Sequence, residues 1–136
     1  MTDTRHATGP FDVKLDPQAP SAPAAAAGLS RMTIDKQFRG DLDARSQGEM
    51  IAFRSPTDGS AGYVALETVT GSLHGRHGSF TLQHSSTMRR GEPAQSIGVV
   101  PDSGTGELAG LDGRMTIVIE GGAHSYRFDY TLPDAR

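Results

Sequence analysis

The most constraining feature of the chain is a strict alternation of apolar and polar residues near its C-terminal end. Over 124–132 one face would carry Tyr126, Phe128, Tyr130 and Leu132, and the other Arg127, Asp129 and Thr131. A period of two is typical of a strand with one buried face. Similar runs recur at about 31–38, 42–53, 61–73, 78–88, 95–100, 105–111 and 114–120, and the first run spans Phe11–Leu15.

Turn-forming residues separate these runs. Pro56-Thr57-Asp58-Gly59, Asp112-Gly113 and Gly121-Gly122 are strong turn signals in a chain that holds 17 glycines. Eight or nine short strands joined by tight turns are typical of a sandwich or a barrel. Because most runs have one apolar and one polar face, we expect an all-β fold, a closed antiparallel barrel of about eight strands. The interior of such a barrel holds side chains or one small ligand.

The length of 136 residues corresponds to one domain. We expect a flexible N-terminal arm at 1–9 and a single β-barrel domain over 10–134. Within the barrel, the Pro/Ala-rich segment 16–29 is interpreted as a loop between the first two strands. Its prolines oppose a helix before Pro23, and the four alanines after it are enough for one helical turn.

The composition argues against several classes of function. With no cysteine, disulfides, thiol catalysis and thiolate metal sites are absent. The net charge of -3 is scattered and forms no basic stripe, so nucleic acid is not an expected partner. The longest uncharged apolar stretch, Ala22–Leu29, is too short to cross a membrane. Because the N-terminus lacks the features of a signal peptide, we expect a cytoplasmic location.

No strong motif for a metal or a cofactor is present. His74 and His77 lie three residues apart beside a turn, without a nearby carboxylate, which is a weak metal site. The Gly-Thr-Gly sequence at 104–106 lacks the Gly-Lys-Ser/Thr ending of a phosphate-binding loop. We therefore expect neither a metal nor a cofactor.

The segment His74-Gly75-Arg76-His77 is interpreted as a type II′ hairpin turn with Gly75 in its first central position. This turn would pair His74 with His77 and, further along, Glu67 with His84. The face that carries Glu67 is the more apolar of the two, so it should line the barrel.

Glu67 and His84 are therefore the first candidates for chemistry. A carboxylate and an imidazole inside a barrel could act as general base and general acid, with the carboxylate fixing the imidazole tautomer. The alternative is a structural cross-strand pair in a filled core. Lys36, on the apolar face of its run, is expected to extend to the barrel rim. It could instead serve as a cation for a carboxylate ligand or as a partner for Glu67.

The other candidate ligand-binding residues are apolar or aromatic and would face inward. The tyrosine hydroxyls could orient a ligand, although a core tyrosine bonded to a protein partner is the more common arrangement. These residues are Tyr63, Phe80, Leu82, Met115, Tyr126, Phe128 and Tyr130, and Ile117 and Ile119 are also expected inside.

Several segments carry a family resemblance. The stretch 103–113 resembles the Gly-Thr-Gly signature of allene oxide cyclases and dirigent proteins. Together with 35–42, 61–71, 78–85 and 124–130, it makes the chain similar to an uncharacterised family of small bacterial proteins with an allene-oxide-cyclase-like barrel. The resemblance implies an eight-stranded barrel and oligomerisation, and it implies no activity.

Three functions remain open from the sequence. The first is a barrel that binds a hydrophobic small molecule, with a polar end at Glu67 and His84. The second is a cofactor-free isomerase or cyclase that uses the same cavity. The third is a filled barrel that acts through its outer surface. Because apolar residues fall on nominally outer faces, we also expect a homo-oligomer, a dimer or trimer; these residues are Ile51, Val64, Leu66 and Val118.

Overall fold

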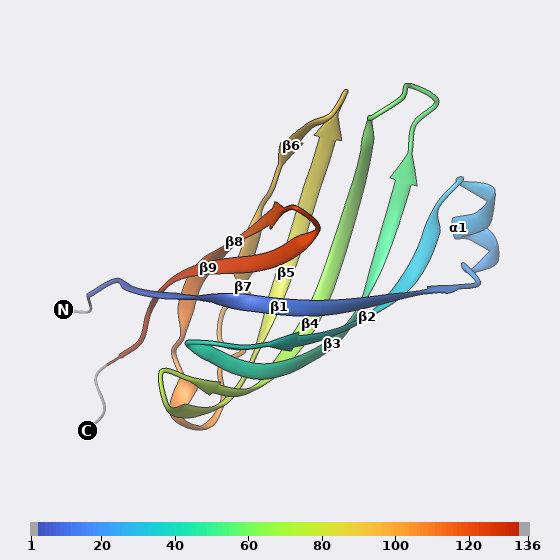
Figure 1. The fold of residues 1–136 in the computed structure, drawn as a ribbon. Helices are drawn as coiled ribbons and strands as arrows, with labels where there is room; N and C mark the ends of the chain where they lie inside the picture. The colour runs from blue at the N-terminus through green and yellow to red at the C-terminus, as the bar shows by residue number, and fades with distance from the viewer. Residues whose placement is uncertain (1–2, 134–136) are drawn as a thin grey trace.

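The alternating segments pair into one antiparallel sheet that closes on itself, as the computed structural model of residues 3–133 shows (Figure 1). The long strands are β1 (Arg5–Gln18), β2 (Ser30–Phe38), β3 (Leu42–Arg54), β4 (Ala61–Leu73), β5 (Arg76–Arg89), β8 (Asp112–Glu120) and β9 (Ala123–Thr131). Two short strands, β6 (Glu92–Ala94) and β7 (Ile97–Val99), a helix α1 (Ala22–Ala26) and a 3₁₀ turn η1 (Gly106–Leu108) complete the described elements.

Eight of these strands form a closed ring in the order β1-β2-β3-β4-β5-β7-β8-β9, and β6 is an extra strand on β5. The predicted eight-stranded antiparallel barrel is therefore confirmed. The ring is weakest between β7 and β8, which share one residue pair, Gly98 with Arg114. Beyond that pair, the side chain of Gln95 takes the place of a strand. Its amide donates to the Ile117 carbonyl oxygen at 2.9 Å and accepts from the Ile117 amide at 3.0 Å.

Three expected segments differ in the structure. Residues 5–9, expected in a loose arm, belong to β1, where Arg5 pairs with Tyr130. The predicted strand at 105–111 is wrong: it is the η1 turn, because Gly106 and Gly110 have positive φ angles of 59° and 83° that break an extended run. The expected loop 16–29 begins inside β1 and contains α1, capped by Ser21.

The register of the β4–β5 hairpin also differs from the prediction. The turn residues are His74 and Gly75, with φ angles of 47° and 81°, as in a type I′ turn. His74 is held there by a 2.5 Å hydrogen bond between its Nδ1 and the Tyr130 hydroxyl. The register is therefore shifted by two residues, so Glu67 opposes Leu82 and His84 opposes Ala65. A shift of two keeps every side chain on its predicted face.

One end of the barrel is filled by packed aromatic rings. Phe80 stacks on Phe128 with ring centroids 5.7 Å apart, and Phe128 stacks on Tyr130 at 5.3 Å. Phe38 meets Tyr126 edge to face at 5.5 Å. Each buried ring of this size contributes about 2 kcal/mol through apolar burial. This end is a packed core.

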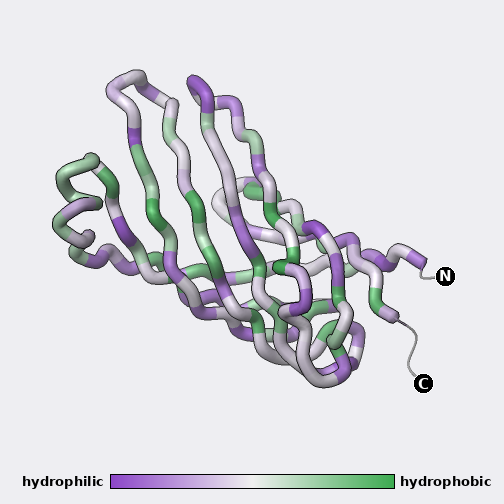
Figure 2. The backbone as a smooth tube through the Cα atoms, turned by 180° about the vertical axis from the view of Figure 1, so that it is seen from behind, coloured by the Kyte–Doolittle hydropathy of each residue, from purple (hydrophilic) through white to green (hydrophobic). Residues whose placement is uncertain are grey.

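At the other end, β3, β4 and β5 project beyond β1, β8 and β9 (Figure 1). Hydrophobic segments recur along the projecting strands (Figure 2). Three apolar side chains at inward positions of this end are exposed: Leu15 at 46%, Met88 at 42% and Ile119 at 62%. Ile119, predicted inside, pairs with His124, whose ring packs on Phe11. It therefore keeps its inward position, but it is not buried because it lies near the tip of the β8–β9 hairpin. Among residues 3–133, no helix has the length and apolarity that a membrane crossing needs.

Replacing Gln95 with Met should weaken the β7–β8 seam, because Met cannot pair with the Ile117 backbone. We expect a loss of about 1 kcal/mol in the free energy of unfolding, with faster hydrogen exchange at the Ile117 amide. Gln83→Met, also on an exposed residue, is the matched control and should change neither quantity. Unchanged exchange at Ile117 in Gln95→Met would show that the side chain does not close the seam.

Candidate functional site

Four polar side chains meet inside the barrel, one from each of the consecutive strands β2, β3, β4 and β5. Glu67 accepts hydrogen bonds from Lys36 Nζ at 2.8 Å, Ser46 Oγ at 2.6 Å and His84 Nε2 at 2.5 Å. All four residues are buried, with exposed fractions between 1% and 6%. The structure thus brings together three of the predicted site residues, and we call these four residues the Glu67 cluster.

The Glu67 carboxylate is ionised. Burial alone would raise the pKa of this carboxyl group, but the hydrogen bond from His84 and the charge of Lys36 outweigh that effect. Together they lower its pKa from the usual 4.5 to about 2. The charge of Lys36 balances that of Glu67, so the ion pair is neutral as a whole.

Local sequence makes room for these polar groups. Gly48 lies opposite Glu67 on β3, where a β-carbon would stand 2.0 Å from the Leu66 carbonyl oxygen. Glycine is therefore required for β3 to approach β4 beside the carboxylate. Lys36 Nζ also lies 5.3 Å from the centre of the Phe11 ring and 5.7 Å from that of Phe38. Such ring faces attract a cation.

The expectation that Lys36 extends to the barrel rim is wrong. Lys36 is 6% exposed and bonded to Glu67, which was the alternative. A rim position fails because Lys36 is paired on both sides, with Val13 and Ser46, and its counter-charge is the buried Glu67 carboxylate.

The hydrogen bonds fix the tautomer of His84. A carboxylate can only accept, so His84 Nε2 carries the proton that bonds Glu67. In a neutral imidazole, Nδ1 is then an acceptor. Within residues 3–133, His84 Nδ1 has no hydrogen-bond partner, and neither has the hydroxyl of Ser86, the next inward residue of β5. Unpartnered buried polar atoms are uncommon in folded proteins.

The inner face beside these two atoms is apolar. Directly paired residues carry Met32, Met50, Ala65 and His84 in one row across four strands. In the next row toward the projecting end, Tyr63 pairs with Ser86. The Tyr63 ring lies 6.3 Å from that of His84, centre to centre, and is partly buried. Tyr63 is the predicted ligand-binding residue that lies beside the Glu67 cluster at the open end.

The remaining predicted ligand-binding residues lie in the packed core. Tyr126 and Tyr130 have protein partners for their hydroxyls: Tyr126 donates to the Arg39 carbonyl oxygen at 2.7 Å, and Tyr130 bonds His74. Burial raises the pKa of both tyrosines. The others are fully buried apolar side chains: Phe80, Leu82, Met115 and Phe128.

Sequence reasoning passed over Ser46 and Ser86 as site residues. Both fall on the inward face in the alternation of their strands. A small polar residue at an inward position between apolar ones was the available signal, because a buried hydroxyl needs a partner.

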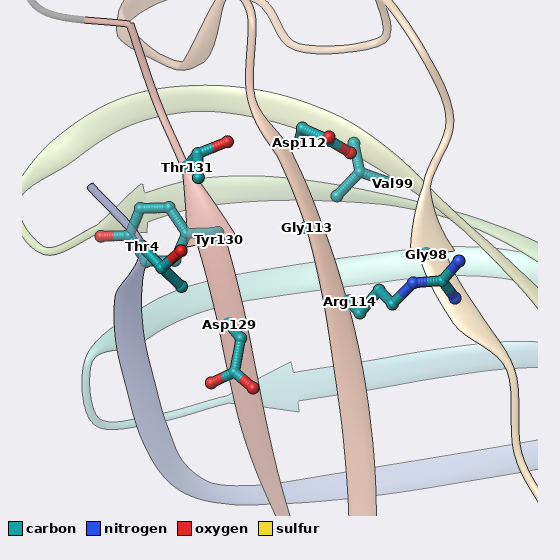
Figure 3. Close-up of a pocket in the computed structure, with 9 residues that line it drawn as sticks. All are labelled: Thr4, Gly98, Val99, Asp112, Gly113, Arg114, Asp129, Tyr130 and Thr131. Carbon is teal, nitrogen blue, oxygen red and sulfur yellow. The ribbon is translucent and has the colours of Figure 1, made fainter. Parts of the chain in front are cut away.

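Two hollows on the outer surface lie away from the Glu67 cluster. The larger, of about 390 Å³, follows the β7–β8 seam, where Arg114 extends from β8 toward Gly98 (Figure 3). The smaller, of about 210 Å³, adjoins it near Gln83 and Ser96. Neither is lined by Glu67 or His84. Over residues 3–133, no three His, Cys, Asp or Glu side chains gather in a way that could hold a metal ion.

Fold and site together define a closed eight-stranded antiparallel β-barrel with a buried ionic cluster on the inner face of β2 to β5. The chain belongs to the family DUF3224, described as a protein of unknown function, whose model matches residues 7–130. It is similar to the crystal structure of a DUF3224 protein with unknown function from Shewanella oneidensis MR-1, with 49% sequence identity and a TM-score of 0.91. That match covers 98% of this chain and 100% of the other. No curated protein matches the chain.

Acid should destabilise the fold through Glu67. A pKa lowered in the folded state means that the charged carboxylate stabilises the fold above about pH 4.5, and this contribution is lost as the pH falls toward about 2. Urea unfolding between pH 7 and pH 2 measures the loss. Glu67→Gln should lower stability by about 3–5 kcal/mol at pH 7, because Lys36 loses its counter-ion, and should flatten the acid dependence.

Glu92→Gln is the control for this experiment, since Glu92 is exposed on β6. It should keep the wild-type dependence on pH. If Glu67→Gln followed the wild-type curve in parallel, the carboxylate would not be the group that titrates.

Proposed function

We propose that the barrel binds a small hydrophobic molecule at its open end. The apolar body of the ligand lies on the inner face of this end, against Met32 of β2, Met50, Tyr63 and Met88. Its polar group lies at the Glu67 cluster. The filled end of the barrel supports this site and takes no part in binding.

The observation that carries the proposal is the exposure of apolar side chains at inward positions of the projecting end. Leu15 and Met88 remain more than 40% exposed, while the inward residues of the other end are almost fully buried. Methionine is unbranched and polarisable, and it adapts to ligands of varied shape. Met32 and Met50 are partly buried neighbours across β2 and β3, so this surface can rearrange around a ligand.

A second candidate is a cofactor-free isomerase or cyclase that works on the same ligand. The observation that favours it is the pairing of His84 with Glu67, since a carboxylate that fixes an imidazole tautomer prepares the other ring nitrogen as a general base. A compound found in the barrel would be tested for turnover by the wild type and by His84→Ala.

We also propose that the barrel is related to the allene-oxide-cyclase-like barrels. The Gly-Thr-Gly stretch supports this relation because it is a structured part of the wall: Thr105 donates its amide to the Ser79 carbonyl oxygen at 2.8 Å. The relation concerns the fold, and no catalytic residue is carried over.

The ligand is sought by native mass spectrometry of the purified protein, followed by solvent extraction. A bound apolar compound is expected in the wild type. Met88→Asp should lose most of it, since a charge at this position opposes an apolar ligand. Thr87→Asp introduces the same charge at the neighbouring residue of β5, on the outer face, and should retain the compound. Equal occupancy in the two variants would contradict binding at the open end.

The outer face of β3 and β4 suggests self-association. Ile51 pairs with Val64, and Leu66 follows two residues on; all three are exposed, between 42% and 54%. We propose that a second copy of the chain covers this face in a dimer or trimer. Light scattering at micromolar concentration should give a dimer or trimer for the wild type and a smaller mass for Leu66→Lys. A monomeric wild type would rule the assembly out.

A further inference from the structure

We infer that His84 Nδ1 and Ser86 Oγ form a hydrogen-bonding subsite for one neutral donor group of the ligand, a hydroxyl of an alcohol or a phenol. This inference rests on the proposed binding function and narrows it to a class of ligand.

The chemistry of the subsite follows from the contacts that His84 already makes. Its Nε2 proton is committed to Glu67. Because Lys36 already balances the charge of Glu67, the proposal takes the His84 ring as neutral, and Nδ1 of a neutral ring can only accept. A ligand group at this nitrogen must therefore donate. The Ser86 hydroxyl can either donate or accept, and it stands two residues along the same strand face. A hydroxyl offers the groups that both atoms need, because it has one donor and two acceptor sites.

Charge argues for a neutral group. Lys36 and Glu67 already cancel each other within the cluster, which leaves no unpaired cation for a carboxylate ligand. The surrounding row of Met32, Met50 and Ala65 is apolar, and an unpaired charge against apolar side chains is strongly disfavoured. The subsite thus selects by hydrogen-bond pattern.

Access to the subsite requires side chains to move, since both polar atoms are buried. In the row that contains His84, Ala65 lies between His84 and Met50. In the next row, Tyr63 lies beside Ser86. Met50 and Tyr63 are only partly buried. Rotation of these side chains leaves the backbone of the barrel unchanged.

The test uses two probes with the same apolar body, 4-butylphenol and its methyl ether, 4-butylanisole. The ether is the more hydrophobic, so apolar burial alone would favour it. A hydrogen bond to His84 Nδ1 should reverse this order and make the phenol about tenfold tighter in the wild type. Calorimetric titration measures both affinities on the full chain.

Two variants locate the hydrogen bond. Ser86→Ala should reduce the preference for the phenol several-fold. Ser85→Ala, the neighbouring residue on the outer face, should leave it unchanged. Nitrogen NMR of the histidine rings supplies a readout that does not depend on a variant that folds poorly. The His84 Nδ1 resonance should be that of an unprotonated nitrogen and should shift with the phenol but not with the ether.

Each contrary result overturns the subsite. Equal affinity for the two probes would show that no donor group binds at His84 Nδ1. A His84 Nδ1 resonance that does not shift when the phenol is added would show the same. A water molecule bridging His84 and Ser86 in a crystal grown with 4-butylphenol would do the same. The binding function fails separately: the methyl NMR signals of Met32, Met50 and Met88 would respond to neither probe, with buried Met115 as the internal reference.

Discussion

The interior of the barrel depends on one carboxylate that stays charged although it is almost fully buried. Burial by itself would push Glu67 toward its neutral form. Three donors, one each on β2, β3 and β5, oppose this, and an uncompensated charge here would cost several kcal/mol. The positions of Lys36, Ser46 and His84 are therefore fixed by the same charge, and with them the alignment of β2 to β5.

The inward residues at the two ends of the barrel differ in how completely they are packed and hydrogen-bonded. At the closed end, aromatic rings pack on one another and the hydroxyls of Tyr126 and Tyr130 bond to neighbouring loops, so packing and polar groups are both complete. At the projecting end, apolar side chains remain exposed to solvent, and the inward atoms His84 Nδ1 and Ser86 Oγ lack partners among residues 3–133. Incomplete packing and incomplete hydrogen bonding coincide at one place, which is the usual condition of a binding site and an uncommon one for a structural core.

Alternation in the sequence was enough to predict the barrel, the inward faces of the main strands and the meeting of Glu67 with His84. It could not fix the hairpin register, because a left-handed His74 depends on a tertiary contact with Tyr130. It also misplaced Lys36, since a pattern of two faces does not reveal how deep a residue lies along the barrel. Because the register error was an even number of residues, His84 stayed on the face of Glu67 and now reaches it diagonally across the hairpin.

The fold and the family do not define the chemistry of this protein, since one fold supports many functions. The function depends on the residues of the site. There, one atom would serve either a carrier or an enzyme. The His84 Nδ1 that would accept a hydrogen bond from a ligand hydroxyl is also the atom that would remove a proton from it, with Glu67 stabilising the imidazolium that results. The protein geometry is the same in both cases. A weakly acidic ligand would stay bound through this hydrogen bond, while a ligand whose proton is acidic enough, or lies beside a group that can rearrange, would react.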